Sequence, residues 1–353
     1  MKLTTLQLEQ LKNRNLKPAQ IEQQYYRLLE GFPKIELHAA ADLGFGITKH
    51  SDEKIKQLAD AYTDQKHQLN IKKFVPASGA ATRMFKFLHK FLREYSPHNE
   101  SINAYINRNK AQNLFTFFVG IEKMPFYKKL QKKLLKCYPY YSDYSLSEQR
   151  WFTVKTLLEK PGLDFSNFPK GLIPFHLYGK KQVSAFEEQL YESIAYASAH
   201  EKLQLIFSVH EDHLKAFEKE LKRVSNTFKN TTNVDLEIQF TFQRKETDTI
   251  SVTQTKELLV DESGALIFRP SGHGALLPNL AEIDADILFI KNIDNVATSE
   301  INQENALYKN YLAGLLLQVQ AQSFEYLNFL ENQRPETPDL NAIKSFVQNT
   351  LNA

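Results

Sequence analysis

A turn of small residues in the first third of the chain is suited to holding an anion. It reads Ala77-Ser78-Gly79-Ala80-Ala81-Thr82-Arg83-Met84 and stands between an apolar run and a helical pattern. Small side chains let backbone N–H groups approach an anion, and a helix that follows at once would direct its positive end there. Thr82 adds a hydroxyl, and Arg83 adds a guanidinium that can bind phosphate through two parallel hydrogen bonds. A tight strand-to-helix turn without a ligand has the same composition.

A glycine loop with a histidine is a second candidate. It reads Arg269-Pro270-Ser271-Gly272-His273-Gly274-Ala275-Leu276. Two glycines around a histidine indicate a loop whose backbone takes unusual angles and comes close to another group. His273 could hydrogen-bond a base, a sugar or a phosphate, and a plain turn with an exposed histidine is the alternative.

A third candidate is the polar end of the apolar run Ile287-Leu288-Phe289-Ile290, where Lys291 and Asp294 follow. A carboxylate at the carboxyl end of a strand is well placed for Mg²⁺, which takes one or two carboxylates plus phosphate oxygens. Lys291 could neutralise phosphate. Asp284 and Asp286 precede the same strand, so we expect them at the opposite sheet edge, in loop solvation or capping.

A lysine in a proline–glycine frame is the fourth candidate, in Phe168-Pro169-Lys170-Gly171. The frame holds Lys170 in a defined direction where it enters a strand-like run. A lysine so held could offset charge on a phosphate.

Strand-like runs alternate with helical patterns through the part of the chain that carries these residues. The expected strands cover residues 71–76, 172–176, 203–209, 234–242, 266–268 and 287–290. Such alternation predicts an α/β fold, with a mostly parallel sheet between helices in a three-layer αβα arrangement. Ligands of such sheets bind beyond the carboxyl ends of the strands.

Helical segments flank and interrupt the expected sheet. Residues 1–69 predict an N-terminal helical extension, with Pro18 at the start of its second helix and Ser51 capping a later one. Residues 70–300 predict the α/β domain, with a helical insertion at about 100–160 that is rich in Lys, Tyr and Phe. Residues 301–353 predict C-terminal helices.

Composition excludes several classes of protein. The 353 residues carry 44 basic and 41 acidic side chains, a net charge of +3 that is too balanced for a nucleic-acid binder. The single cysteine, Cys137, excludes an internal disulfide and fits a reducing compartment. The N-terminus lacks the apolar core of a signal peptide, and the apolar stretches are far shorter than the roughly 20 residues of a membrane span. We therefore expect a cytoplasmic protein with no membrane partner.

Taken in order, the candidate segments resemble the nucleotide-sugar pyrophosphorylases, most closely the UTP–sugar-1-phosphate uridylyltransferases. The turn is similar to that family's signature Leu/Ala-Gly-Gly-x-Gly-Thr-Arg-Leu/Met, which Gly79, Thr82, Arg83 and Met84 match. Further matches are Pro169-Lys170-Gly171 with the substrate lysine segment, Leu205-Ile206-Phe207-Ser208-Val209-His210 with the third strand, Gly272-His273-Gly274 with the glycine loop, and Ile293-Asp294-Asn295 with the Val-Asp-Asn strand end. The whole chain also resembles an uncharacterised, domain-of-unknown-function branch near this superfamily.

The resemblance implies a GT-A-like fold and an enzyme that joins a nucleoside triphosphate, UTP in the first instance, to a sugar 1-phosphate with release of pyrophosphate. It implies Mg²⁺ as cofactor, with Asp294 as its ligand. It also implies three catalytic residues: Arg83 at the pyrophosphate, Lys170 at the sugar phosphate and Asp294 at the metal. The implied nucleotide- and phosphate-binding residues are Ser78, Gly79, Ala80, Thr82, Gly272, His273 and Gly274.

Departures from the family pattern keep a second hypothesis open. Ser78 and Ala81 stand where the signature has glycines, and each adds a Cβ that changes how closely a phosphate can approach. No second metal carboxylate is identifiable after residue 300. The alternative is a catalytically diverged protein that binds a nucleotide or sugar phosphate without transferring it.

Overall fold

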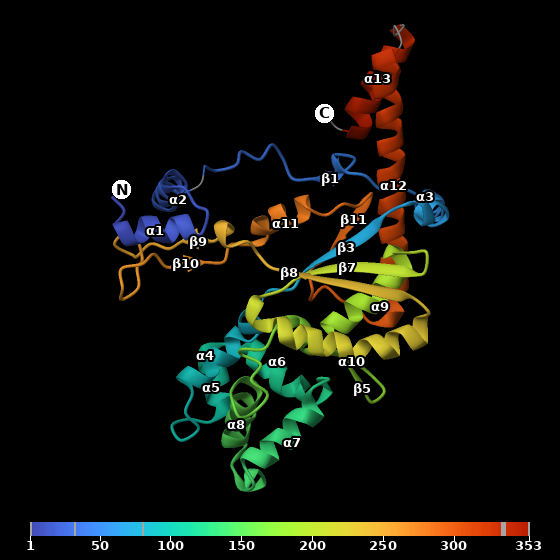
Figure 1. The fold of residues 1–353 in the computed structure, drawn as a ribbon. Coiled ribbons are helices and arrows are strands. Elements are labelled where there is room, and N and C mark those ends of the chain that lie inside the picture. The colour runs from blue at the N-terminus through green and yellow to red at the C-terminus, as the bar shows by residue number, and fades with distance from the viewer. Residues whose placement is uncertain (1, 32, 80, 333–336, 352–353) are drawn as a thin grey trace.

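A five-stranded sheet lies at the centre of the computed structural model, which describes residues 2–31, 33–79, 81–332 and 337–351 of a mixed α/β protein (Figure 1). Four of its strands run parallel in the order β11 (Ile287–Ile290), β3 (Ile71–Pro76), β7 (Lys202–Ser208) and β8 (Asp235–Thr241). The fifth, β6 (Ser198–Ala199), pairs antiparallel with the start of β7.

Burial along the strands follows their places in the sheet. The central strands β3 and β7 are almost continuously buried, whereas the edge strand β8 alternates between exposed and partly buried positions. Continuous apolar runs are typical of parallel strands covered on both faces, and alternation is typical of a strand with one wet face. The alternating pattern predicted for residues 234–242 is confirmed.

The order in which successive parallel strands are added to the sheet reverses once. The chain passes from β3 to β7 to β8 in one direction and then returns to place β11 on the other side of β3. β11 therefore lies beside β3, although β3 is the first strand of the parallel set in the sequence and β11 the last. In open α/β sheets such a switch point leaves a crevice beyond the strand ends, where ligands bind.

Helices cover the two faces of the sheet unequally. One face packs against α9 (Ala185–Ala197), α10 (Leu214–Thr232), α3 (Asp52–Gln65) and α12 (Ser299–Asn332) in the largest core cluster. The other face carries a small cluster beneath the five-residue helix α11 (Leu277–Ala281). Figure 1 shows α9 and α10 on the opposite side of the strands from α11.

Two runs predicted to join the main sheet form hairpins instead, so the prediction of a mostly parallel sheet is wrong for the chain as a whole. The first is β4 (Pro174–Tyr178), which pairs antiparallel with β5 (Lys181–Ser184). Gly179, at φ +61°, starts a two-residue turn that favours this local pairing. The second is β10 (Phe268–Arg269), which pairs antiparallel with β9 (Thr249–Ile250).

The N-terminal helices build a small core with the second hairpin. Helix α1 (Thr5–Asn13) and helix α2 (Pro18–Glu30) contribute Leu11 and Ile21 to a cluster completed by Leu16, Ile250 and Leu266. Thr4 caps α1, Pro18 opens α2 as predicted, and Ser51 caps α3 as predicted. The chain from α2 to α3 carries the two short paired strands β1 (Asp42–Leu43) and β2 (Gly46–Ile47).

A helical subdomain with its own core is inserted into the chain between β3 and α9. Its helices are α4 (Lys86–Glu94), α5 (Ile102–Asn109), α6 (Gln112–Gly120), α7 (Tyr127–Cys137) and α8 (Leu146–Leu158). They bury an aromatic-rich cluster that includes Phe91 and Phe165 and that is distinct from the core beneath the sheet. Figure 1 shows the subdomain projecting from one end of the molecule. The Phe and Tyr content of this region is thus explained by its separate core.

The long helix α12 packs along α3 and continues past the sheet (Figure 1). Gly314 permits the close crossing, because a Cβ there would lie 2.0 Å from the carbonyl oxygen of Leu58. A last helix, α13 (Thr337–Phe346), follows, and its Phe346 ring contacts Tyr326 of α12. Within the described part of the chain, no helix is both long enough and apolar enough to cross a membrane.

Candidate functional site

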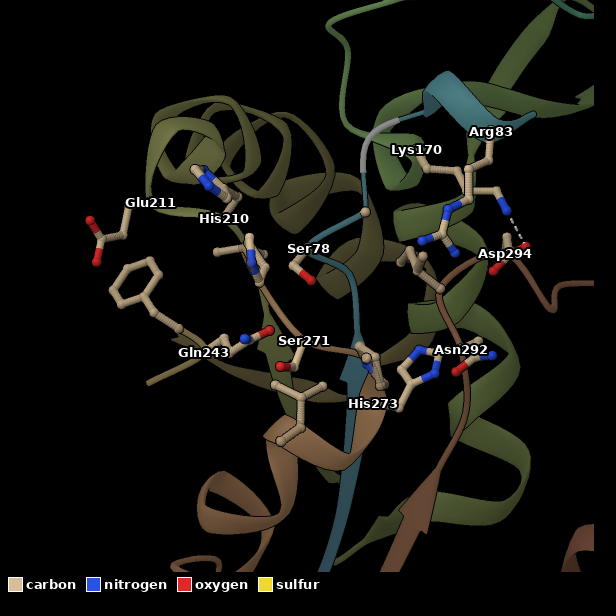
Figure 2. A pocket seen from close by; sticks show the side chains of 18 of the residues that line it. Ser78, Arg83, Lys170, His210, Glu211, Gln243, Ser271, His273, Asn292 and Asp294 are labelled. Carbon is tan, nitrogen blue, oxygen red and sulfur yellow. Dashed lines mark hydrogen bonds and ion pairs between the residues drawn. The ribbon is translucent and has the colours of Figure 1, made fainter. Parts of the chain in front are cut away.

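A cavity of about 690 Å³ lies beyond the carboxyl ends of β3, β7, β8 and β11, at the switch point of the sheet. Figure 2 shows its side chains arriving from all four strand ends and from the loop before α11. The sequence-predicted residues that line it are Ser78, Gly79, Thr82, Arg83, Lys170, Gly272, His273 and Asp294. Gly274 is exposed beside the cavity and is not part of its wall, and Ala80 lies outside the described residues.

The turn after β3 is locked to the sheet at its first residue. The Ala77 amide donates to the Ser208 carbonyl over 2.7 Å, and Ala77 is fully buried. Beyond it the chain opens toward the cavity, where Thr82 and Arg83 are exposed. A Cβ built on Gly79 would meet no atom within 4 Å, so its backbone faces free space.

The helix predicted directly after this turn begins later. Residues Ala81–Arg83 form a 3₁₀ turn, and α4 starts only at Lys86, with Phe85 as an N-cap that offers no side-chain oxygen. The prediction that a helix follows the turn at once is therefore wrong, since α4 begins three residues after Arg83. Charge and hydroxyl groups, rather than a helix end, define this wall of the cavity.

The segment that carries Lys170 runs along the turn. The Lys170 amide donates to the Gly79 carbonyl over 3.2 Å, and the Ala81 amide donates to the Phe168 carbonyl over 3.4 Å. Gly171 then packs against the β11 side of the site, since a Cβ there would lie 2.8 Å from Cγ1 of Ile293. Glycine at this position is what allows the two segments to approach.

This approach brings Lys170 and Asp294 together. The ammonium of Lys170 and the carboxylate of Asp294 form an ion pair, drawn as a dashed line in Figure 2. Their side chains are 27% and 32% exposed, so the pair lies at the cavity surface and is open to solvent. Residues 124 positions apart in the sequence are thus partners in the site.

Asp294 is placed by an extension of the parallel ladder. Beyond β11, the Lys291 amide donates to the Phe74 carbonyl and the Ile293 amide to the Pro76 carbonyl, each over 3.2 Å. From helix α9, the Gln189 side chain donates to the carbonyls of Asn292 at 2.9 Å and Ile293 at 3.3 Å. The backbone before Asp294 is therefore fixed from two sides.

Arg83 is an exposed cation in the wall of the cavity. No hydrogen bond or ion pair to its side chain occurs among the described residues. Figure 2 shows its guanidinium directed into the cavity on the same side as Lys170 and Asp294. A guanidinium in this situation is available to an anionic ligand.

The loop before α11 forms another wall of the cavity and carries His273. Gly272 precedes a 3₁₀ turn, His273–Leu276, that leads into α11 and leaves His273 exposed at the cavity. Ser271, which the sequence reasoning did not select, also lines the cavity, and its buried Oγ has no partner in the described structure.

The residues at the far end of the cavity are not among the site residues predicted from the sequence. His210 and Glu211 follow β7, and Gln243 follows β8, opposite the Lys170 end in Figure 2. Gln243 donates from its side chain to Asp248 over 3.2 Å, and Asp248 pairs with Arg14 of the helix α1 end at 3.0 Å. The rule that ligands bind beyond the carboxyl ends of strands would have pointed to these residues, because both strands were predicted.

A family of unknown function matches residues 4–353 of the chain, a domain described as DUF4301. The chain belongs to the DUF4301 family. Comparison with curated proteins gives no match, and neither does comparison with solved structures. The DUF4301 match covers every segment that contributes to the cavity, in agreement with the expectation of an uncharacterised family.

Lys291, expected to face phosphate, points away from the cavity. Its ammonium contacts Oε2 of Glu192 at 2.6 Å, while the wholly buried Lys73 contacts Oε1 of Glu192 at 2.8 Å. The prediction for Lys291 is wrong because the pleat of the strand end directs its side chain to the α9 face. Burial lowers the pKa of Lys73 to about 7, against the opposing effect of Glu192.

Asp284 and Asp286 lie at the amino edge of β11, as expected for capping residues. The carboxylate of Asp286 accepts from the Asn70 amide at 2.7 Å, and the Asp284 carbonyl accepts from the Asn70 side chain at 2.9 Å. Both contacts join the starts of β3 and β11, away from the cavity.

The donor set at the Lys170 end suits a hard cation only in part. No group of three or more His, Cys, Asp or Glu side chains is arranged for a metal in the part of the chain that the structure describes. Mg²⁺ commonly binds proteins through one or two carboxylates together with substrate phosphates and water. Asp294 fits that role as a single ligand in the company of a bound phosphate.

Proposed function

We propose that this DUF4301 protein is a nucleotidyltransferase that joins a nucleoside triphosphate, UTP in the first instance, to a sugar 1-phosphate and releases pyrophosphate. The observation that carries the proposal is the meeting of Arg83, Lys170 and Asp294, from three distant segments, on one cavity. The resemblance to uridylyltransferases implies roles in catalysis and metal binding for the same three residues.

The position and size of the cavity support a ligand of this kind. It lies at the switch point between β3 and β11, where open α/β sheets bind nucleotides. Its volume of about 690 Å³ falls within the usual range of roughly 300–1,000 Å³ for small-molecule sites. We further propose that the sheet and its helices are a diverged GT-A-like core.

The proposed reaction needs no covalent nucleophile on the protein. A phosphate oxygen of the sugar 1-phosphate attacks the α-phosphorus in line, a new P–O bond forms, and the bond to the departing pyrophosphate breaks. Catalysis then comes from positioning and charge neutralisation. Arg83 stabilises the pyrophosphate, and Lys170 binds the sugar phosphate after leaving Asp294. Mg²⁺, held by Asp294 and phosphate oxygens, would add charge neutralisation when bound.

Five other residues of the cavity wall bind the nucleotide in this proposal. Backbone groups of Ser78 and Gly79 and the hydroxyl of Thr82 contact phosphate, and Gly272 with His273 lines the base or sugar. We place the activity in the cytoplasm, in accord with the single cysteine, and propose neither nucleic acid nor membrane as a partner.

A second candidate function is binding without transfer. Ser78 and Ala81 replace glycines of the related signature, and Asp294, the single carboxylate on the Lys170 side of the cavity wall, is already paired. These observations favour a diverged protein that holds a nucleotide or a sugar phosphate.

One assay separates the two functions. The purified chain is incubated with Mg²⁺, each common nucleoside triphosphate and a panel of sugar 1-phosphates, and pyrophosphate release is measured. Release that needs both substrates supports transfer. Thermal stabilisation by nucleotide without release supports binding, because a ligand of the folded state raises its stability. No release and no stabilisation by any of these compounds would remove both proposals.

A further inference from the structure

The Lys170–Asp294 ion pair has a consequence for any cation that binds at this end of the cavity. The ammonium of Lys170 already contacts Oδ2 of Asp294, and both side chains line the cavity. A divalent cation would need the same carboxylate oxygens. Two cations that compete for one carboxylate repel each other unless an anion is bound between them.

No other carboxylate on the cavity wall can take the place of Asp294. The remaining two in the described structure are Glu211 and Asp248, and Figure 2 shows Glu211 on the opposite side of the cavity. Asp248 adjoins that far end through Gln243 and is paired with Arg14 at 3.0 Å. A cation near Arg83 and Lys170 therefore depends on Asp294 alone.

The ion pair can open without moving the backbone. The amide of Lys170 is held by the Gly79 carbonyl, Gly171 is packed against Ile293, and the carbonyls of Asn292 and Ile293 are held by Gln189. What remains free is the flexible four-carbon stem of Lys170, whose compact ammonium can reach a different anion. A phosphate bound near Arg83 is such an anion.

We propose that Lys170 is a resident counter-ion that keeps divalent cations off Asp294 until a phosphate draws its ammonium away. This inference rests on the proposed function, since it assumes the phosphate site beside Arg83 and the cation site on Asp294. Metal and phosphate then bind together, and the site binds a divalent cation only weakly when no phosphate is present.

The test uses Mn²⁺ as the probe and needs no catalytic turnover. Free Mn²⁺ is counted by electron paramagnetic resonance in titrations of the full-length protein, Lys170→Met, Asp294→Asn and the double variant Lys170→Met/Asp294→Asn. Lys170→Met is expected to bind Mn²⁺ at least tenfold more tightly than the unchanged protein, and the double variant is expected to lose that gain. Thermal unfolding confirms that each variant is folded.

A matched control removes a lysine from a different surface pair. Lys202→Met frees Glu237, which is 57% exposed and lies away from the cavity, and no gain in Mn²⁺ binding is expected from it. Adding inorganic phosphate should strengthen Mn²⁺ binding by the unchanged protein more than by Lys170→Met, because only the former has an ammonium to displace.

Two results would overturn the inference. One is a folded Lys170→Met variant that binds Mn²⁺ no better than the unchanged protein. The other is a gain that persists in the double variant, which would place the cation elsewhere. Failure of the pyrophosphate assay would leave this test intact, because Mn²⁺ binding to Lys170→Met requires neither nucleotide nor sugar phosphate.

Discussion

Two lysine–carboxylate groups lie on opposite sides of the β11 end, and they differ in how completely the protein satisfies them. In the buried group, Glu192 accepts from Lys73 and Tyr196 at one oxygen and from Lys291 at the other. In the cavity group, Lys170 is the one side-chain partner of Asp294 among the described residues. Exposure follows the same division, with 0% and 2% for Lys73 and Glu192 against 27% and 32% for Lys170 and Asp294.

The difference assigns the two groups to different tasks. A buried charge is costly unless paired, and breaking such a pair strongly destabilises a protein. An exposed pair contributes little to stability, about 0–1 kcal/mol, and its charges remain available to a ligand. The Glu192 group is therefore structural and supports the floor of the site, whereas the Asp294 group is the part that can exchange partners.

The largest expected effect on stability comes from Glu192→Ala. This change leaves two lysine side chains without their carboxylate in the core and should lower the free energy of unfolding by about 3–5 kcal/mol. Asp294→Ala is the matched control and should cost no more than about 1 kcal/mol. Urea denaturation of both variants measures this. Equal losses would mean that the two groups do not differ in the way described.

The largest expected effect on function comes from Arg83→Ala. If the proposed transfer takes place, removing this guanidinium should reduce the rate of pyrophosphate release by about 10²–10³-fold, as for other preorganised charge-stabilising groups. The unfolding temperature should not change, because Arg83 is exposed and its side chain has no hydrogen bond or ion pair with the described residues. A near-normal rate would remove Arg83 from the mechanism.

A smaller effect is expected on the pH dependence of stability. Burial lowers the pKa of Lys73 to about 7 from its ordinary value of 10.5, with Lys291 adding to the effect and Glu192 opposing it. Between about pH 7 and 10.5 the unfolded chain therefore binds more protons at this lysine than the folded protein does. The free energy of unfolding should rise with pH across that window, and the contribution is least favourable below pH 7.

Lys73→Met tests this prediction, because it removes the titrating group and leaves Lys291 on Glu192. Denaturation curves at several pH values between 7 and 10 should show a shallower rise for the variant than for the unchanged protein. The same slope in both proteins would show that Lys73 is protonated in the folded state over the whole range.

The smallest effect on stability is expected for Gly79→Ala, and Gly171→Ala provides the comparison. A Cβ at residue 79 meets nothing within 4 Å, so the unfolding free energy should change by less than about 0.5 kcal/mol. A Cβ at residue 171 would press on Ile293 and should cost about 1–3 kcal/mol. Nucleotide titrations should nevertheless show weaker binding by Gly79→Ala. Unchanged binding would mean that no ligand approaches this backbone.

The strands of the main sheet were predictable because their apolar runs are continuous or alternate, and these patterns depend on local sequence. The place of residues 172–176 could not be predicted in the same way. It depends on whether the chain turns back at Gly179 to form a hairpin or continues through a crossover into the main sheet. The late start of α4 has a similar cause. Ala81–Arg83 have small or polar side chains that suit a helix and a 3₁₀ turn equally, and the hydrogen bond from the Ala81 amide to the Phe168 carbonyl joins segments that no local pattern relates.

The cavity was predictable to the extent that its residues follow strands. Asp294 was found because it ends β11, and Lys291 was misassigned because the sequence does not show which face of the strand end each side chain takes. The Lys170–Asp294 pair depends on the close packing of Gly171 and Ile293, which no local pattern reveals. Gln243 and Asp248 were missed because neither belongs to a motif.

The most direct test of the proposed phosphate and cation sites is a crystal structure of the chain with UTP and Mg²⁺. We expect the triphosphate against the turn that carries Ser78, Gly79 and Thr82, with Arg83 on its phosphates and with Lys170 separated from Asp294. A nucleotide bound elsewhere, or a nucleotide in this cavity with the Lys170–Asp294 pair still closed, would contradict this expectation.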